Sequence, residues 1–210
     1  MPRIAAPTVA EHHARQRQAL LDAAHTILAE TGEAPSMGEV GRRAGLARSS
    51  VYQYFASADE LLGALVEELF PDWAGKVLGR VAEASTPSGR VWAYIEANVD
   101  LFASSEQAVA QALSRVVEPH VLAGPMTEFH AQLQVPLREA LSEFGEPEPE
   151  AVAEHIDSLI VQASRGLSST DPESPVPAKD RALARLRRLL GGYLHLPESP
   201  GSEAERGSSG

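Results

Sequence analysis

The sequence predicts an all-α protein, and three observations support that fold class. Apolar residues recur at the three- and four-residue spacing of amphipathic helices along most of the chain. Capping boxes of the form S-x-x-E, at Ser36 and at Ser57, mark helix starts near the amino terminus. No segment shows the alternation of apolar and polar residues that predicts a half-buried strand. We therefore expect helices throughout.

The first predicted helix runs from Gln18 to Thr31 and stops at Gly32, since glycine accepts the left-handed backbone common after helices. Residues 1–14 before it are predicted to be a flexible arm. The apolar face of the helix consists of Leu20, Leu21, Ala24, Ile27 and Leu28.

Two short helices follow, joined by a tight turn. Ser36 and Glu39 form the capping box of a helix that starts at Met37 and ends near Ala44, with Gly45–Ala47 as the turn. A second helix is predicted over Arg48–Phe55, and the box at Ser57 opens another. Three helix starts within about 25 residues are typical of a helix-turn-helix, a DNA-binding motif.

The predicted helix Arg48–Phe55 leaves a polar face exposed, which suits a DNA groove because small side chains allow close approach. Arg48 can pair with guanine or grip a phosphate, Gln53 can read adenine, and tyrosine hydroxyls can bond phosphate oxygens. Which of them read bases stays open. The predicted DNA-binding residues are Ser36, Arg42, Arg48, Ser49, Ser50, Tyr52, Gln53 and Tyr54.

Motifs in the segment from Gln18 to Leu62, taken together, identify a resemblance. A-G-L stands before the second short helix, and V-Y-Q-Y-F and S-x-D-E-L-L follow. This combination resembles the tetracycline-repressor (TetR) family of bacterial regulators. The resemblance implies a three-helix DNA-binding domain followed by a larger helical domain for ligand binding and dimerisation. It also implies a transcription regulator, and favours a repressor.

The chain departs from the family pattern at two positions. Ala47 stands where a serine or threonine commonly caps the recognition helix, and Ala58 stands where a lysine often follows the next capping serine. One phosphate anchor is therefore in doubt. Arginines nearby can compensate, because each neutralised phosphate adds to a sequence-independent attraction; they are Arg15, Arg17, Arg42 and Arg43.

The net charge of −11 argues against a protein that coats nucleic acid indiscriminately. The charge is unevenly placed, however, because three arginines against one acid give +2 between Pro35 and Phe55. An acidic body with a basic reading surface favours specific binding.

Beyond residue 57 the pattern stays helical, with breaks at proline and glycine. We expect a DNA-binding domain over 15–57, a regulatory and dimerisation domain over 58–196 and a disordered tail over 197–210. The predicted helices are 58–70, 72–85, 90–104, 105–118, 126–144, 150–168 and 178–191, and the first two are alternatively one long helix.

Two of these helices carry apolar faces that the resemblance assigns to a homodimer interface, although packing inside one chain explains them equally well. Dimerisation is expected because a two-fold pair reads a palindromic operator with far more specificity than one copy. The interface candidates are Leu133, Leu137, Leu141, Phe144, Val152, Ile156, Leu159, Ile160, Ala163 and Leu167.

The resemblance also implies a cavity for a small-molecule effector, whose binding changes the separation of the two DNA-binding domains. Large residues on the intervening helices are candidates for its lining, although such residues are more often core. They are Trp73, Trp92, Tyr94, Phe102, Met126, Phe129 and His130. No residue identifies the effector.

Other functions have less support. The sequence has no cysteine, no repeated Glu-x-x-His pair for a di-metal bundle and no H-E-x-x-H or G-x-S-x-G motif, so we expect neither an enzyme, a metal site nor a cofactor. The lack of a long apolar run or a signal peptide predicts a cytoplasmic protein with no membrane partner. The remaining alternatives are a ligand-independent, chromosome-organising DNA-binding protein and, more distantly, a helical-bundle metalloenzyme.

Overall fold

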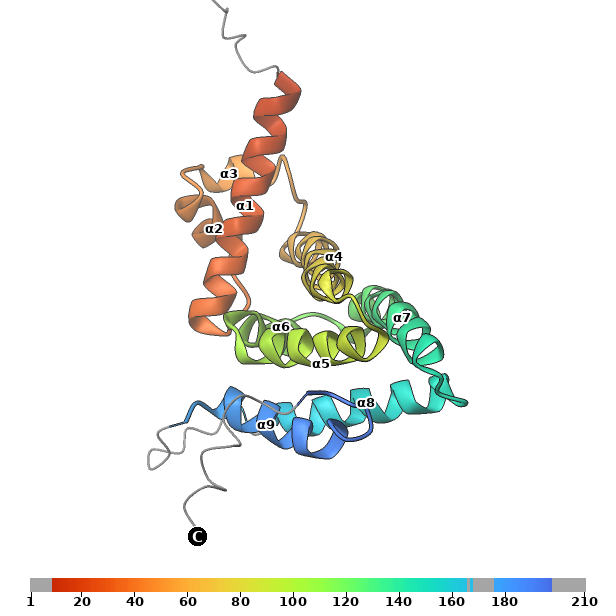
Figure 1. Ribbon diagram of the computed structural model, residues 1–210. Helices are drawn as coiled ribbons and strands as arrows, with labels where there is room; N and C mark the ends of the chain where they lie inside the picture. The colour runs from red at the N-terminus through yellow and green to blue at the C-terminus, as the bar shows by residue number, and fades with distance from the viewer. Residues whose placement is uncertain (1–8, 166, 168–175, 198–210) are drawn as a thin grey trace, which may run out of the picture. The chain divides into compact units, whose positions relative to one another are not determined.

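The computed structural model describes residues 9–165, 167 and 176–197, and over these the regular elements are all helices (Figure 1). The prediction of an all-α protein is confirmed. The helices are α1 (Val9–Thr31), α2 (Met37–Arg43), α3 (Arg48–Val51), α4 (Ala58–Glu83), α5 (Pro87–Ala103), α6 (Ser105–Val116), α7 (Pro119–Phe144), α8 (Pro149–Ser164) and α9 (Ala178–Leu190).

Helix starts that follow a capping box lie where the sequence places them, at Met37 and Ala58. Other boundaries differ. Helix α1 begins at Val9 rather than Gln18, so residues 9–14 of the predicted arm are helical, and its first buried side chain is Leu20. Of the tail predicted over 197–210, residues 198–210 lie outside the described residues.

Two prolines that were expected to separate helices are accommodated inside them. Helix α4 is continuous through Pro71, as the one-helix alternative holds, because this residue lies on the exposed side of the helix. Helix α7 starts at Pro119 rather than 126 and runs through Gly124 and Pro125. A proline in a helix costs one backbone hydrogen bond, and that loss is smaller where water can reach the freed carbonyl.

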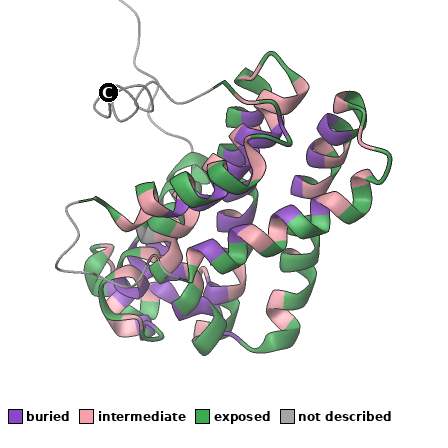
Figure 2. Ribbon diagram, turned by 60° about the horizontal axis from the view of Figure 1, so that its bottom comes forward, coloured by how far each residue is buried: buried purple, intermediate pink, exposed green. Residues whose placement is uncertain are grey.

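The helices group into two compact units. Unit 1 comprises Met1–Ala74 and Ser104–Ala131, and unit 2 comprises Gly75–Ala103 and Gln132–Gly210. Along the helices of both units, buried and exposed residues alternate at helical spacing (Figure 2). The boundary predicted between residues 57 and 58 stays a prediction.

The core of unit 1 joins α1 to α2, α3 and α6. In α1, Leu20, Leu21 and Leu28 are all fully buried. Val40 of α2 and Val51 of α3 are also inaccessible to solvent. Full burial of a valine or leucine side chain contributes about 1.5–3 kcal/mol, so this small set suffices to hold short helices that would not persist alone.

Unit 2 is built on α5, which packs against α8 and α9. Val91, Ile95 and Val99 of α5 have no exposed surface. They recur at spacings of four, the pattern of a helix that buries one face.

Candidate nucleic-acid interface

Helix α2 is held at its start by the predicted cap. The Glu39 amide donates to Ser36 Oγ over 3.2 Å. The turn into α3 requires Gly45, whose φ of +74° lies in the left-handed region. The amide of Leu46 then donates to the carbonyl of Gly41 over 2.8 Å. These bonds fix the direction in which α3 leaves the turn.

Gly41 permits the close packing of α2 on α3, a role that the sequence analysis missed. A Cβ atom at this position would lie 2.8 Å from Val51 Cγ2 and 3.0 Å from the Leu46 carbonyl oxygen. Only glycine fits there without movement of α3. A glycine inside a capped, strongly helical segment was the available signal.

Helix α3 is shorter than predicted, because it ends at Val51 and continues to Tyr54 only as turns. Its N-cap, Ala47, makes no side-chain hydrogen bond, as the departure from the family pattern implies. The segment Arg48–Phe55, here called the recognition segment, nevertheless buries Val51 and Phe55 beneath it.

The recognition segment presents a polar surface. Ser49, Tyr52 and Gln53 are exposed, and Ser50 is half-buried. Arg48, also exposed, donates through Nη2 to the Tyr52 hydroxyl over 3.4 Å. This hydrogen bond raises the pKa of Arg48 above its ordinary value, at which the guanidinium is already positive. Cation, hydroxyls and amide lie on one short stretch, as DNA recognition requires.

Tyr54 is placed differently from Tyr52. It is half-buried, and its hydroxyl donates a short hydrogen bond to Gln16 Oε1 on α1. Its ring lies against His13, with centroids 4.5 Å apart. A hydroxyl that donates to Gln16 cannot donate to a phosphate at the same time. The geometry therefore favours a positioning role for Tyr54.

The arginines of α2 also differ from each other. Arg43 Nη2 lies 2.7 Å from Glu30 Oε2, an ion pair that offsets its charge. Arg42 is exposed. Of the two, Arg42 is the better placed to attract a phosphate.

In unit 1, the predicted pocket residues fall beside an aromatic group on α4 and α7. Phe70 lies 5.3 Å from Trp73 and 5.6 Å from Phe129 between ring centroids, and Phe129 lies 5.7 Å from His130. Trp73 is buried, whereas Met126 and His130 are exposed. The structure brings together three of the predicted residues with Phe70, which was not predicted.

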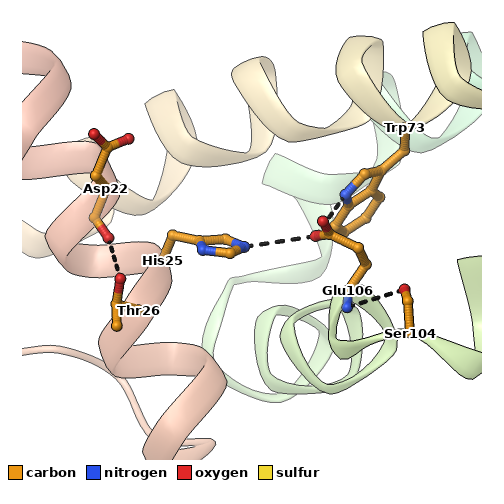
Figure 3. Close-up of polar contacts among 6 residues, drawn as sticks. All are labelled: Asp22, His25, Thr26, Trp73, Ser104 and Glu106. Carbon is orange, nitrogen blue, oxygen red and sulfur yellow. Dashed lines mark hydrogen bonds and ion pairs between the residues drawn. The ribbon is translucent and has the colours of Figure 1, made fainter.

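Trp73 connects this aromatic group to α1 through Glu106 (Figure 3). Its Nε1 donates to Glu106 Oε2 over 2.9 Å, and the same oxygen lies 3.5 Å from His25 Nε2. Glu106 is further fixed by its amide, which donates to Ser104 Oγ. Neither His25 nor Glu106 was predicted as a site residue from the sequence. The signal was a histidine four residues after Leu21, on the buried face of α1.

In unit 2, the predicted pocket residues Trp92 and Tyr94 contact other side chains of the same unit. Arg187 Cζ lies 5.2 Å from the centroid of the Trp92 ring. Tyr94 donates to Asp157 Oδ1 over 2.7 Å. Burial, and secondly the Asp157 charge, raises the pKa of Tyr94 far above its ordinary value. Phe102, also a candidate, is half-buried.

The Asp157 carboxylate receives a second bond, a short one from Gln134 Nε2, and Arg138 donates through Nε and Nη2 to Gln134 Oε1. These groups join α5, α7 and α8 through polar contacts. They specify how the three helices of unit 2 pack, because each would leave an unpaired polar atom in another register.

Most of the predicted dimer-interface residues are used inside the chain. Six of them are buried in one copy: Leu133, Leu137, Leu141, Ile156, Ile160 and Ala163. Four are half-buried: Phe144, Val152, Leu159 and Leu167, the last beyond the end of α8. The six buried residues pack inside one copy, as the packing alternative holds, and the dimer interface stays a prediction.

Other apolar residues on α8 and α9 are exposed instead. Val161 retains 45% of its surface and Leu189 retains 60%. Among the described residues, no helix is long and apolar enough to cross a membrane. In the same ranges, no three histidine or acidic side chains gather in a way that could hold a metal ion.

Comparison with known proteins identifies the family. Residues 20–65 match the family model described as bacterial regulatory proteins of the tetR family. The chain is 29% identical to the HTH-type transcriptional repressor LfrR of Mycolicibacterium smegmatis over 161 residues, 77% of this chain and 69% of LfrR.

Solved structures share the fold. A TetR/AcrR-family regulator from Thermobifida fusca superposes with a TM-score of 0.66 at 18% identity, over 84% of this chain and 96% of its own. AibR, in complex with isovaleryl coenzyme A and operator DNA, superposes with a TM-score of 0.62 at 17% identity, over 82% and 97%. Residues 20–65 of this chain therefore carry the DNA-binding unit of the TetR family of bacterial regulatory proteins, and the chain shares the all-helical fold of a solved TetR-family regulator.

Proposed function

We propose that the protein is a homodimeric repressor that binds a palindromic operator through its recognition segments and leaves it when a small-molecule effector binds. The observation that carries the proposal is the recognition segment itself. Its cation and polar groups are exposed, while Val51 and Phe55 hold it on the core. A surface so built presents side chains to base edges without unfolding.

A single recognition segment is too short for high specificity, so we place two of them on one operator. In helix-turn-helix dimers the half-sites lie about 34–36 Å apart, one turn of DNA. The exposed faces of α8 and α9, with Val161 and Leu189, are the surfaces we assign to the partner copy. This assignment replaces the buried residues of α7.

The effector is the second part of the proposal. AibR was solved with both isovaleryl coenzyme A and operator DNA, so at least one protein of this fold binds a small ligand. In this chain we assign the effector to the aromatic group of Phe70, Trp73 and Phe129. Glu106 joins Trp73 to His25 of α1, which supplies a path from that group to the DNA-binding helices.

The energetics set a requirement on the effector. Converting a population from 1:99 to 99:1 takes about 5.5 kcal/mol of differential affinity between the DNA-competent and incompetent states. Because the coupling is reciprocal, operator DNA must weaken effector binding by the same factor by which the effector weakens DNA binding.

The test is selection of bound sequences from randomised duplex DNA with the full chain and the Arg48→Ala variant. We expect the wild type to enrich a palindrome and Arg48→Ala to enrich none. Arg115→Ala is the matched control, because it removes the same charge from an exposed position on α6. A folded wild type that enriches no sequence would contradict the proposed function.

A further inference from the structure

We propose that the first turns of α1, residues Val9–Arg17, form a second DNA-contacting surface, which binds the sugar–phosphate backbone beside the recognition segment. We call these residues the α1 extension. The inference rests on the proposed function and extends it, because it assigns an additional binding surface and the residues that position it.

The α1 extension does not serve the core. Every buried side chain of α1 lies at Leu20 or later. Within the extension, Val9 is 88% exposed, and His12, His13 and Arg15 are exposed. Helical stability in proteins comes mainly from a buried apolar face, and these turns have none. Their order therefore depends on contacts of another kind.

Those contacts converge on the recognition segment. His13 stacks on Tyr54, and Gln16 accepts the hydrogen bond of the same tyrosine. One helical turn after His13, Arg17 Cζ lies 5.3 Å from the centroid of the Phe55 ring. Figure 1 shows the amino-terminal turns of α1 running past α3. The extension is thus continuous with the surface that reads DNA.

The charge of the extension suits phosphate. It carries Arg15 and Arg17 against one acid, Glu11, in a chain whose net charge is −11. Arg15 Nε donates to the Glu11 carbonyl, and the two terminal nitrogens of its guanidinium carry further N–H donors. Since Tyr54 is held by Gln16 and Ala47 offers no hydroxyl, arginines here replace phosphate contacts that the recognition segment lacks.

The length of the extension fixes what it can reach. Nine helical residues span about 12 Å, the rise of roughly three to four base pairs. This length matches a short stretch of duplex DNA next to the half-site, the occupant to which we assign the extension. Backbone contacts of this kind add affinity and fix orientation without reading sequence.

The experiment measures operator affinity against salt concentration, using the selected palindrome in two lengths. The long duplex has ten extra base pairs at each end, and the short one stops at the half-sites. With two contacts per dimer, Arg15→Ala should reduce the log–log salt slope on the long duplex by about 1.8 and weaken binding about tenfold. On the short duplex the variant should bind like the wild type.

Two further variants separate contact from position. Tyr54→Phe removes the hydrogen bond to Gln16 without freeing a hydroxyl for phosphate, so it should weaken binding to the long duplex in the same direction although no charge is removed. The control is Arg115→Ala. Arg115 lies on α6, near Gly32 at the other end of α1, and its removal should change neither the salt slope nor the affinity. If the wild type binds the operator and Arg15→Ala shows the same salt slope as the wild type, the inference is refuted while the proposed function stands. A wild type that selects no operator would instead refute the proposed function.

Discussion

His25 Nε2, on α1, lies 3.5 Å from Glu106 Oε2, on α6, and that oxygen also accepts the indole hydrogen bond of Trp73 on α4. One carboxylate thus joins three helices of unit 1. The histidine side chain is 31% exposed and that of Glu106 is 20% exposed, so the pair is only partly shielded from water. The contact connects α4, which carries part of the proposed effector position, to α1, the helix on which α2 of the DNA-binding motif packs.

Removing the carboxylate should destabilise unit 1. We expect Glu106→Leu to lower the free energy of unfolding by about 1–3 kcal/mol, because the buried Trp73 N–H loses its acceptor. Glu106→Gln keeps an acceptor oxygen and should cost less. Urea unfolding followed by circular dichroism measures both, and equal losses in the two variants would argue against the indole bond as the cause.

Gly41 should be intolerant of a side chain. Gly41→Ala places a methyl group 2.8 Å from Val51 Cγ2, so α3 must shift, at a cost of about 1–3 kcal/mol. Gly38→Ala is the control on the same helix, because its methyl group meets only Arg48 Cδ at 3.7 Å. That variant should be unchanged or slightly more stable. Thermal unfolding compares them, and similar melting temperatures for the two would contradict the packing argument.

Tyr94 should make the protein sensitive to alkali. Burial raises its pKa in the folded state above the ordinary value of 10.0, so the unfolded state loses the phenolic proton first. This contribution to stability is fully present below pH 10.0 and is lost as pH rises above it. Unfolding free energies measured from pH 8 upward should fall less steeply in Tyr94→Phe than in the wild type. Parallel curves would count against this assignment.

The Tyr94→Phe variant should also be less stable at neutral pH. It leaves Asp157 with one donor fewer, a loss of about 1–3 kcal/mol. The alkaline comparison therefore concerns the slope of the curve and not its height.

The oligomeric state should depend on exposed residues of α8 and α9. Val161→Glu and Leu189→Glu alter side chains that one copy leaves 45% and 60% exposed, so each variant should fold and sediment as a monomer. Leu137→Asp, in contrast, charges a core position and should unfold the chain. A folded Leu137→Asp monomer, with dimeric Val161→Glu and Leu189→Glu, would restore the interface predicted from the sequence.

Local signals in the sequence predicted the local structure well. The capping box at Ser36 and the one at Ser57 place the starts of α2 and α4 correctly, because a cap is a bond between near neighbours. The α1 extension could not be predicted in this way. Its contacts are made with Tyr54, which lies 38 residues after Gln16 in the chain.

The apolar faces show the same division. The spacing of Leu133, Leu137 and Leu141 correctly predicted a buried face, but a repeat cannot tell whether its own chain or a second copy covers it. In α7 the chain itself covers these three leucines, and their assignment to a dimer interface stays a prediction. The paired roles of His25 and Glu106 were likewise hidden, because the two residues belong to helices that meet only in the fold.

The most direct test of the account compares specific with non-specific binding at one fixed salt concentration. The selected palindrome and the same duplex with one half-site scrambled are titrated with wild type, Arg48→Ala and Arg115→Ala. We predict that the wild type and Arg115→Ala prefer the palindrome by a factor of about 10³ or more, and that Arg48→Ala loses most of this preference while remaining a dimer. Equal affinities of the wild type for the two duplexes would contradict a paired, sequence-reading recognition segment.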